Sequence, residues 1–176
     1  MKLNELHDHL FEVLCVIDDI CKKNNTSYYL DSGTLLGAVR EGDFIPWDDD
    51  LDIKVLAEDY PAFKAALEKD LPSYMHIVEP DVFLPNFYDF IVRIYDDRYM
   101  VRKENAKDTS YNNIDNYVGT DVFIMAPVPN EKIGKKMIFN INVLYGMAMS
   151  RRSGIEWDKY SGMQKISVAF LTTIGK

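Results

Sequence analysis

The sequence is poor in cysteine. Its 176 residues include two cysteines, Cys15 and Cys21. Both fall in one segment that is predicted to be helical, where six positions correspond to an axial distance of about 9 Å. A disulfide cannot span that distance. We therefore expect two reduced thiols, as in a protein of the cytoplasm.

Long apolar runs and a secretory signal are also missing. No segment reaches the roughly 18 apolar residues of a membrane-spanning helix. The N-terminal segment carries Glu5, Asp8 and Glu12 where a signal peptide would have an apolar core. These two absences predict a cytoplasmic location.

Basic residues are in deficit. Lysine and arginine number 20 against 28 aspartates and glutamates, which gives a formal net charge of −8. This balance excludes a nucleic-acid-binding protein that works through a broad basic surface. Hydrophobic residues make up 47% of the chain, enough for a substantial core. The length predicts one domain.

Helical and extended segments alternate along the chain. Apolar spacing predicts helices over residues 3–23, 57–70 and 131–150, and a short helix over 34–40. Strands are predicted over the start of 27–33 and over 51–55, 76–79, 90–95 and 118–125, and the polar segment 96–117 is predicted to be a long loop. This order favours an α+β fold in which helices flank a mixed β-sheet.

An acidic run precedes one of the predicted strands. It comprises Asp48, Asp49, Asp50 and Asp52. Like charges at this spacing repel one another, and burial beside apolar residues makes the repulsion stronger. Such runs are usually solvated loops, but this one leads directly into an apolar strand. The pattern disfavours an EF-hand, because Ile53 stands where the calcium loop needs a glycine.

Asp50 and Asp52 are predicted to share one face of this strand. Residues two apart in a strand point to the same side, with their Cα atoms about 6.7 Å apart. Two such carboxylates can hold one or two divalent cations, and oxygen ligands favour Mg²⁺ or Mn²⁺. Asp121, embedded in the strand predicted over 118–125, is our candidate for a third carboxylate. These three residues are the predicted catalytic and metal-binding residues.

A strand-to-helix turn upstream contains Ser32, Gly33 and Thr34, with Ser32 as the expected N-cap. Backbone N–H groups at a helix N-terminus bind phosphate oxygens, and glycine permits close approach. The two hydroxyl groups can add hydrogen bonds. Arg40, two turns further along, is a second phosphate-binding candidate. A glycine turn alone is a weak signal, and its value here comes from the carboxylates that follow it.

The segment LDSGTLLGAVREGDFIPWDDDLDI, residues 30–53, resembles the signature of the LicD family, the phosphocholine transferases of the nucleotidyltransferase fold. Fukutin-type proteins share this signature. The leading amphipathic helix, the strand FIVRIY and the strand with Asp121 followed by MAP extend the resemblance over roughly residues 1 to 130.

The resemblance implies a helix-flanked, nucleotidyltransferase-like sheet with a phosphate-binding turn at residues 32–34. It implies Mg²⁺ held by Asp50 and Asp52, with Asp121 as the third carboxylate. It also implies an enzyme that transfers phosphocholine, or a related phospho-alcohol, from a CDP-activated donor. The acceptor would be a hydroxyl of a cell-surface glycan, such as a lipopolysaccharide or teichoic acid precursor.

Two departures from the family pattern stand out. The segment after Asp121 reads VFIMAPVPN, where the family usually has a more acidic run. Family members tend to be longer than a chain that ends at Lys176. We expect a single domain over residues 1–176, and both a shortened form and a fragment without acceptor-binding elements remain open.

Two alternative functions also remain open. One is nucleotidyl transfer to a sugar or other small molecule, with attack at the nucleoside-bearing phosphorus. The other is a non-catalytic nucleotide-binding or metal-binding module. The sequence does not distinguish choline from ribitol or glycerol as the transferred alcohol, and it leaves the oligomeric state open.

Aromatic and basic residues supply further substrate-binding candidates. Trp47, beside the acidic run, is the preferred candidate for cation–π contact with a quaternary ammonium group. Arg93, in the strand predicted over 90–95, is expected to face either a phosphate or solvent. Tyrosines at 28, 29, 88 and 95 are weaker candidates, because tyrosines more often pack in or around a core.

The segment 132–152 has basic ends around an apolar centre. The basic residues are Lys132, Lys135, Lys136, Arg151 and Arg152. Such a segment can rest on an anionic membrane, which would place the protein at the inner face of the membrane. A core helix with basic ends is the alternative.

Overall fold

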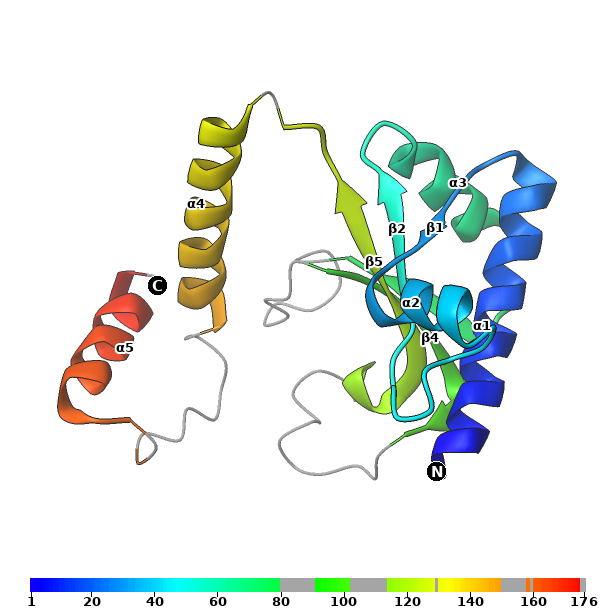
Figure 1. The fold of residues 1–176 in the computed structure, drawn as a ribbon, viewed down its shortest axis with the longest axis horizontal. Helices are drawn as coiled ribbons and strands as arrows, with labels where there is room; N and C mark the ends of the chain where they lie inside the picture. The colour runs from blue at the N-terminus through cyan, green and yellow to red at the C-terminus, as the bar shows by residue number, and fades with distance from the viewer. Residues whose placement is uncertain (80–90, 102–113, 129, 150–157, 159, 175–176) are drawn as a thin grey trace.

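The computed structural model describes residues 1–79, 91–101, 114–128, 130–149, 158 and 160–174 (Figure 1). Its elements, in chain order, are α1 (Leu3–Asn24), β1 (Tyr29–Leu30), α2 (Ser32–Arg40), β2 (Asp52–Leu56), α3 (Tyr60–Asp70), β3 (Met75–Val78), β4 (Val92–Met100), the 3₁₀ helix η2 (Ile114–Asn116), β5 (Tyr117–Met125), α4 (Glu131–Met149) and α5 (Gly162–Ile174).

The five strands form one mixed sheet in the order β1-β2-β5-β4-β3. β2 and β5 run parallel, and the other neighbouring pairs are antiparallel. The predicted α+β fold with a mixed, helix-flanked sheet is therefore confirmed. The parallel pair at the centre brings together two strands that are far apart in sequence.

α1 packs along one face of the sheet, where it also meets α3 (Figure 1). Its stripe of Leu6, Leu10, Val13, Ile17 and Ile20 is buried, as the helical spacing predicts. The Glu5 side chain accepts a hydrogen bond from the backbone N–H of Lys2 at 3.0 Å, which satisfies an N–H group at the N-terminus of the helix. Asn25, in the left-handed conformation with φ of 53°, ends the helix.

Alternation along the strands separates the two faces of the sheet. Ile53 and Val55 of β2 are fully buried in the core that α1 and α3 cover, as is Val122 of β5. Asp52 and Lys54 alternate with the buried residues of β2, so they belong to the opposite face. Leu51 also enters this core, since neither it nor Ile53 exposes more than 1% of its surface.

Several predicted boundaries differ from the structure. α2 begins at Ser32 rather than at Thr34, so Asp31 is the N-cap residue and the prediction of Ser32 as N-cap is wrong. β2 begins at Asp52, so Asp50 lies in the segment before the strand and not within it. α3 begins at Tyr60, behind a turn that follows β2.

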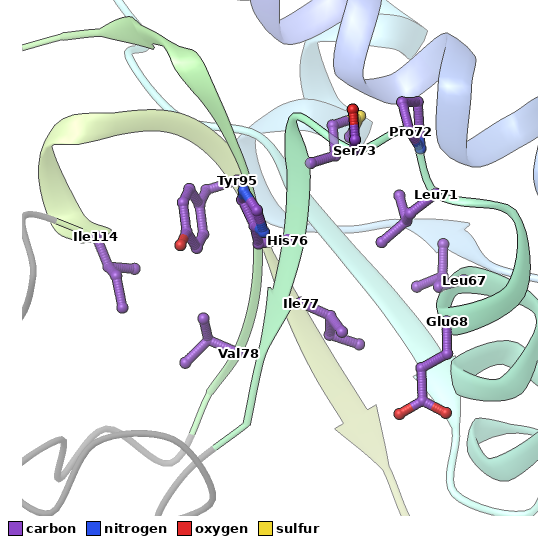
Figure 2. Close-up of a pocket in the computed structure, with 11 residues that line it drawn as sticks. Leu67, Glu68, Leu71, Pro72, Ser73, His76, Ile77, Val78, Tyr95 and Ile114 are labelled. Carbon is purple, nitrogen blue, oxygen red and sulfur yellow. The ribbon is translucent and has the colours of Figure 1, made fainter.

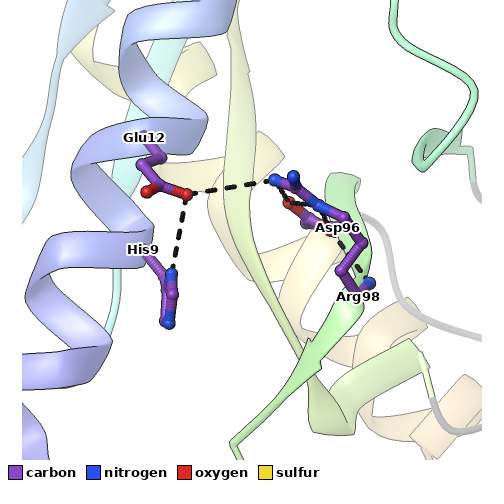
Figure 3. A network of polar contacts seen from close by, with 4 residues as sticks. All are labelled: His9, Glu12, Asp96 and Arg98. Atoms are coloured by element: carbon purple, nitrogen blue, oxygen red, sulfur yellow. Dashed lines mark hydrogen bonds and ion pairs between the residues drawn. The ribbon is translucent and has the colours of Figure 1, made fainter.

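The predicted loop over residues 96–117 is also wrong at its start, because β4 continues to Met100 and includes Asp96 and Arg98 (Figure 3). Asp96 is 1% exposed, and its carboxylate accepts hydrogen bonds from Arg98 Nε at 3.0 Å and Nη2 at 2.6 Å. Arg98 also lies 3.9 Å from Glu12 of α1 and stacks over the ring of Tyr74. This compensation of charge allows an acidic residue to occupy the strand. Residues 102–113 lie outside the described residues.

α4 and α5 pack on each other, and in Figure 1 the sheet lies between them and α1. Among the helices that the structure describes, none combines the length and the hydropathy that crossing a membrane would require. Cys15 is exposed and Cys21 is buried, and both are free thiols, as expected.

Candidate functional site

Three charged side chains form a row across the centre of the sheet. Asp52 of β2 is the register partner of Asp121 of β5, and Asp121 is in turn the partner of Arg93 of β4. Partners in register share a face of the sheet. Arg93 Nη1 donates a hydrogen bond to Asp121 Oδ1 at 3.2 Å. The row therefore joins two carboxylates and one guanidinium on the face opposite to α1.

The charge balance of the row is unfavourable to ionised Asp52. Partial burial, followed by the charges of Asp50 and Asp121, raises the pKa of Asp52 from 3.8 to about 6. A hydrogen bond from Ser32 opposes this rise without cancelling it. Partial burial, together with Asp48 and Asp49, likewise raises the pKa of Asp50. Burial and neighbouring carboxylates thus disfavour the ionised forms of Asp50 and Asp52, which a bound cation would favour.

The loop before β2, called the acidic loop below, contains a second set of carboxylates. One oxygen from each of Asp48, Asp49 and Asp50 lies within 4.8 Å of the others, a spacing that can hold a metal ion. Exposed acidic groups often lie close together without a metal, so this set does not by itself define a site. Asp50 links the loop to the row, because it interacts electrostatically with Asp52 and Asp121. That Asp50, Asp52 and Asp121 share one ion stays a prediction.

α1 and α2 hold the acidic loop in place. A Cβ atom at Gly33 would lie 2.2 Å from Asp48 Oδ2, so this position accepts no side chain while Asp48 keeps its place. The carbonyl oxygen of Asp48 lies 2.7 Å from His7 Nε2 of α1, and the His7 ring stacks on Phe44. Gly33, which is predicted to let a phosphate approach the backbone, therefore also leaves room for the carboxylate of Asp48.

Ser32 has an unusual backbone conformation. Its φ of 47° is in the left-handed region, which non-glycine residues seldom occupy. Its side chain forms a hydrogen bond with Asp52, and the backbone of Ser32 forms one with the carboxylate of Asp31. The turn therefore contacts the carboxylate row directly. Its predicted contact with phosphate stays a prediction.

Thr34 has a structural contact that the sequence did not predict. It is buried, and its Oγ1 accepts a hydrogen bond from the backbone N–H of Asp52 at 2.9 Å. This bond fixes the residue that begins β2 and so sets the position of the Asp52 side chain. A phosphate contact by the Thr34 hydroxyl stays a prediction.

The remaining predicted substrate-binding residues are spread more widely. Arg40 lies at the far end of α2, about 12 Å along the axis from Ser32, and it pairs with Glu41 at 2.6 Å. The structure therefore does not bring Arg40 to the turn. Trp47 is 74% exposed beside the acidic loop, where its ring is accessible to a ligand.

Two of the tyrosine candidates have contacts with residues outside the row. Tyr28 donates a hydrogen bond to Asp18, and Tyr95 stacks on Tyr117. Tyr29 of β1 is half exposed. Tyr88 lies outside the described residues.

Lys54 and Asp31 are site residues that the sequence reasoning missed. Lys54 Nζ lies 2.9 Å from Asp31 Oδ1, and this pair spans the N-terminus of α2 and the face of β2 that carries Asp52. The signal was present, because Lys54 stands two positions after Asp52 in a strand and must share its face. The importance of Asp31 depended on the pairing of β1 with β2, which local sequence does not specify.

The hollow in Figure 2 is separate from this site. It has a volume of about 500 Å³ and lies between α3 and the edge strand β3, where Leu67, His76 and Tyr95 are among its lining residues. No residue of the row and no aspartate of the acidic loop lines this hollow. We therefore do not assign the chemistry to this hollow.

Comparison with known proteins confirms the resemblance. Residues 25–83 match the family described as LicD/FKTN/FKRP, nucleotidyltransferase domain. An uncharacterized protein of Rickettsia prowazekii is 30% identical over 95% of this chain and 63% of its own length. The lipopolysaccharide cholinephosphotransferase LicD of Haemophilus influenzae is 27% identical over 74% of this chain and 48% of its own length. The ribitol 5-phosphate transferase FKRP of human and mouse is 56% identical, over 18% of this chain and 6% of its own length.

The match to the LicD family thus lies in the segment that carries the glycine turn and the acidic run. The chain spans about half to two thirds of the length of the longer-matching relatives.

Proposed function

We propose that this chain is a LicD-type transferase that moves phosphocholine, or a closely related phospho-alcohol, from a CDP-activated donor to a hydroxyl of a cell-surface glycan precursor. The observation that carries the proposal is the row of Asp52, Asp121 and Arg93, with the acidic loop beside it. Paired carboxylates on one face of a central strand suit a reaction on a diphosphate bridged by divalent cations.

The residues present fit a magnesium or manganese ion. Burial, followed by neighbouring carboxylates, raises the pKa values of Asp50 and Asp52, and carboxylate oxygens are ligands that these ions prefer. Asp50 and Asp52 would hold the ion, with Asp121 as the third carboxylate. When bound, such an ion neutralises the diphosphate and the leaving nucleotide.

The chain's own residues would orient the donor and manage the proton. In the reaction, the acceptor oxygen bonds to the phosphorus that carries the alcohol, and the bond from that phosphorus to CMP breaks. The hydroxyl proton passes to a carboxylate of the row. Lys54 and Arg93 supply positive charge on the same face, and the exposed ring of Trp47 offers a cation–π surface to choline.

The relatives favour phosphocholine over ribitol phosphate as the transferred group. The cholinephosphotransferase matches 74% of this chain, whereas the ribitol phosphate transferase matches 18%. Both are named as transferases of a phosphorylated alcohol, and this class of reaction is the part of the proposal that the two support together.

A donor-turnover assay tests the proposal. CDP-choline, CDP-ribitol and CDP-glycerol are incubated with the chain, with and without Mg²⁺. Water serves as the surrogate acceptor of the phospho-alcohol, and the release of CMP is measured. We expect Mg²⁺-dependent CMP release that falls at least about 100-fold in Asp52→Asn and is unchanged in Glu58→Gln, which alters an exposed acidic residue in the turn after β2.

Three results would contradict the proposal. Full activity in Asp52→Asn would remove the proposed site. Release of pyrophosphate from a nucleoside triphosphate, without CMP release from these donors, would indicate nucleotidyl transfer. Mg²⁺-dependent binding of the donors without turnover would indicate a non-catalytic binding module.

A further inference from the structure

The helices α4 and α5 expose an unusual amount of apolar surface. More than 40% of the side-chain surface is exposed at Ile133, Met137, Ile138, Phe139, Ile141 and Val143 of α4, and at Met163, Ile166 and Phe170 of α5. Contiguous apolar surface that is exposed on a protein often marks an interaction site.

The apolar residues of α5 form a single stripe. Met163, Ile166 and Phe170 follow one another at spacings of three and four, so they share one face of the helix. They are 83%, 71% and 63% exposed. The packing of α4 on α5 leaves this face uncovered in the described structure. The stripe is therefore available to a partner.

α4 is exposed on more than one side. Ile138 and Phe139 are neighbours in sequence and point about 100° apart around the helix, yet both are more than 60% exposed. Helices that are apolar around much of their circumference are normally buried. Exposure of apolar side chains to water on both sides of such a helix is unfavourable, and transfer of these side chains to an apolar environment would remove this cost.

The charge of the two helices is opposite to that of the whole chain. The chain has a formal net charge of −8, whereas α4 and α5 together contain four lysines and one glutamate. Three of the lysines, Lys132, Lys135 and Lys136, lie in the first two turns of α4, and all three are exposed. Glu131 pairs with Lys135 at 2.5 Å. The apolar surface is thus bordered by positive charge.

We propose that α4 and α5 bind the surface of an anionic lipid bilayer. The stripe of α5 and the apolar residues of α4 would enter the boundary between headgroups and acyl chains, and the lysines at the start of α4 would contact lipid phosphates. Exposed apolar residues bordered by lysines are the combination that interfacial helices use. Complementary charge selects a lipid surface over a second copy of this acidic chain. Arg151 and Arg152 lie outside the described residues and are not needed for the argument.

This surface is independent of the carboxylate row. None of its residues belongs to the candidate site, so membrane binding can be present without turnover and turnover without membrane binding. Binding to a bilayer would hold the chain beside acceptors that are carried on lipid.

Vesicle flotation tests the proposal. The chain is mixed with vesicles of phosphatidylcholine alone, and with vesicles that also contain the anionic lipid phosphatidylglycerol. We expect flotation with the anionic vesicles that weakens as salt is raised. The triple variant Met163→Ser, Ile166→Ser, Phe170→Ser should lower the partition coefficient at least about tenfold. The triple variant Lys132→Gln, Lys135→Gln, Lys136→Gln should lower it roughly 100-fold.

Matched controls separate this surface from general charge and hydrophobicity. The variant Lys2→Gln, Lys22→Gln, Lys69→Gln removes three exposed lysines elsewhere and should bind as the original chain does. The variant Phe11→Ser, Leu36→Ser, Val39→Ser removes three exposed apolar residues of α1 and α2 and should also bind normally. Circular dichroism checks that each variant keeps its helices.

Several results would overturn the proposal. Failure of the original chain to float with anionic vesicles would do so, as would equal flotation with neutral vesicles. Normal binding by the α5 stripe variant would also overturn it. Light scattering that shows a dimer which the stripe variant abolishes, without vesicle binding, would assign the surface to a second copy instead.

Discussion

Asp52 and Asp121 are register partners on adjacent parallel strands, although a large part of the chain separates them in sequence. Arg93 pairs with Asp121 from the next strand, but burial, Asp50 and Asp121 still raise the pKa of Asp52 to about 6. A carboxylate that burial and like charges disfavour at neutral pH costs folding free energy. Such a cost is expected where a group is arranged for function rather than for stability.

The first prediction concerns stability without metal. Replacing Asp52 by Asn removes a destabilising charge, so we expect the variant to be more stable than the original chain at pH 7 in EDTA. Because the side chain is only partly buried, we expect a modest rise in Tm of about 2–4 °C, which corresponds to about 1 kcal/mol in a domain of this size. Differential scanning fluorimetry measures it. Glu58→Gln should leave Tm unchanged, and a lower Tm in Asp52→Asn would contradict the electrostatic account.

The second prediction concerns pH. The folded-state pKa of Asp52, about 6, lies above its ordinary value of 3.8. The folded state therefore holds a proton that the unfolded state has lost, and this group's contribution to stability falls as pH rises from about 4 to about 6. In EDTA, the Tm difference between Asp52→Asn and the original chain should be near zero below pH 4, grow through pH 6 and then level off. A Tm difference that shrinks with rising pH would contradict a raised pKa of Asp52 in the folded state.

The third prediction concerns Thr34. Thr34→Val removes the acceptor of the Asp52 N–H group and leaves a partly buried donor without that partner. We expect a loss of about 1–3 kcal/mol in the free energy of unfolding, measured by urea denaturation. Thr34→Ser keeps the hydroxyl and should retain most of the stability. Equal losses in the two variants would indicate that the methyl group, and not the hydrogen bond, matters at this position.

The fourth prediction concerns Gly33. A Cβ atom at this position would lie 2.2 Å from Asp48 Oδ2, so Gly33→Ala must displace the Asp48 side chain. We expect weaker Mg²⁺-dependent donor binding, seen as a smaller thermal shift on adding CDP-choline with Mg²⁺. Gly162→Ala is the matched control, since its added methyl group meets nothing within 4 Å. An unaltered thermal shift in Gly33→Ala would show that the placement of Asp48 does not affect the site.

Local sequence predicts the elements of this fold well where apolar periodicity is strong. The helical spacing of Leu6, Leu10 and Val13 predicts α1, and these three residues are buried. The alternation of Leu51 and Ile53 with Asp52 predicts which face of β2 is buried. The strand that carries Asp121 was also predictable, because apolar residues follow that aspartate directly.

Contacts between distant segments were not predictable in the same way. The pairing of β2 with β5 joins residues far apart in the chain, and only this register places Asp52 beside Asp121. Asp96 was assigned to a loop because it is charged, and its burial depends on Arg98 two positions later. The hydrogen bond of Thr34 to the Asp52 backbone likewise requires the folded turn.

The decisive experiment is calorimetric titration of Mg²⁺ into metal-free protein in the presence of CDP-choline. Asp52→Asn and Glu58→Gln are titrated in parallel. We expect saturable binding by the original chain, an affinity at least about tenfold lower in Asp52→Asn, and an unchanged affinity in Glu58→Gln. Binding of Mg²⁺ by Asp52→Asn as tight as that of the original chain, or no binding by the original chain, would contradict a metal-dependent site at Asp52.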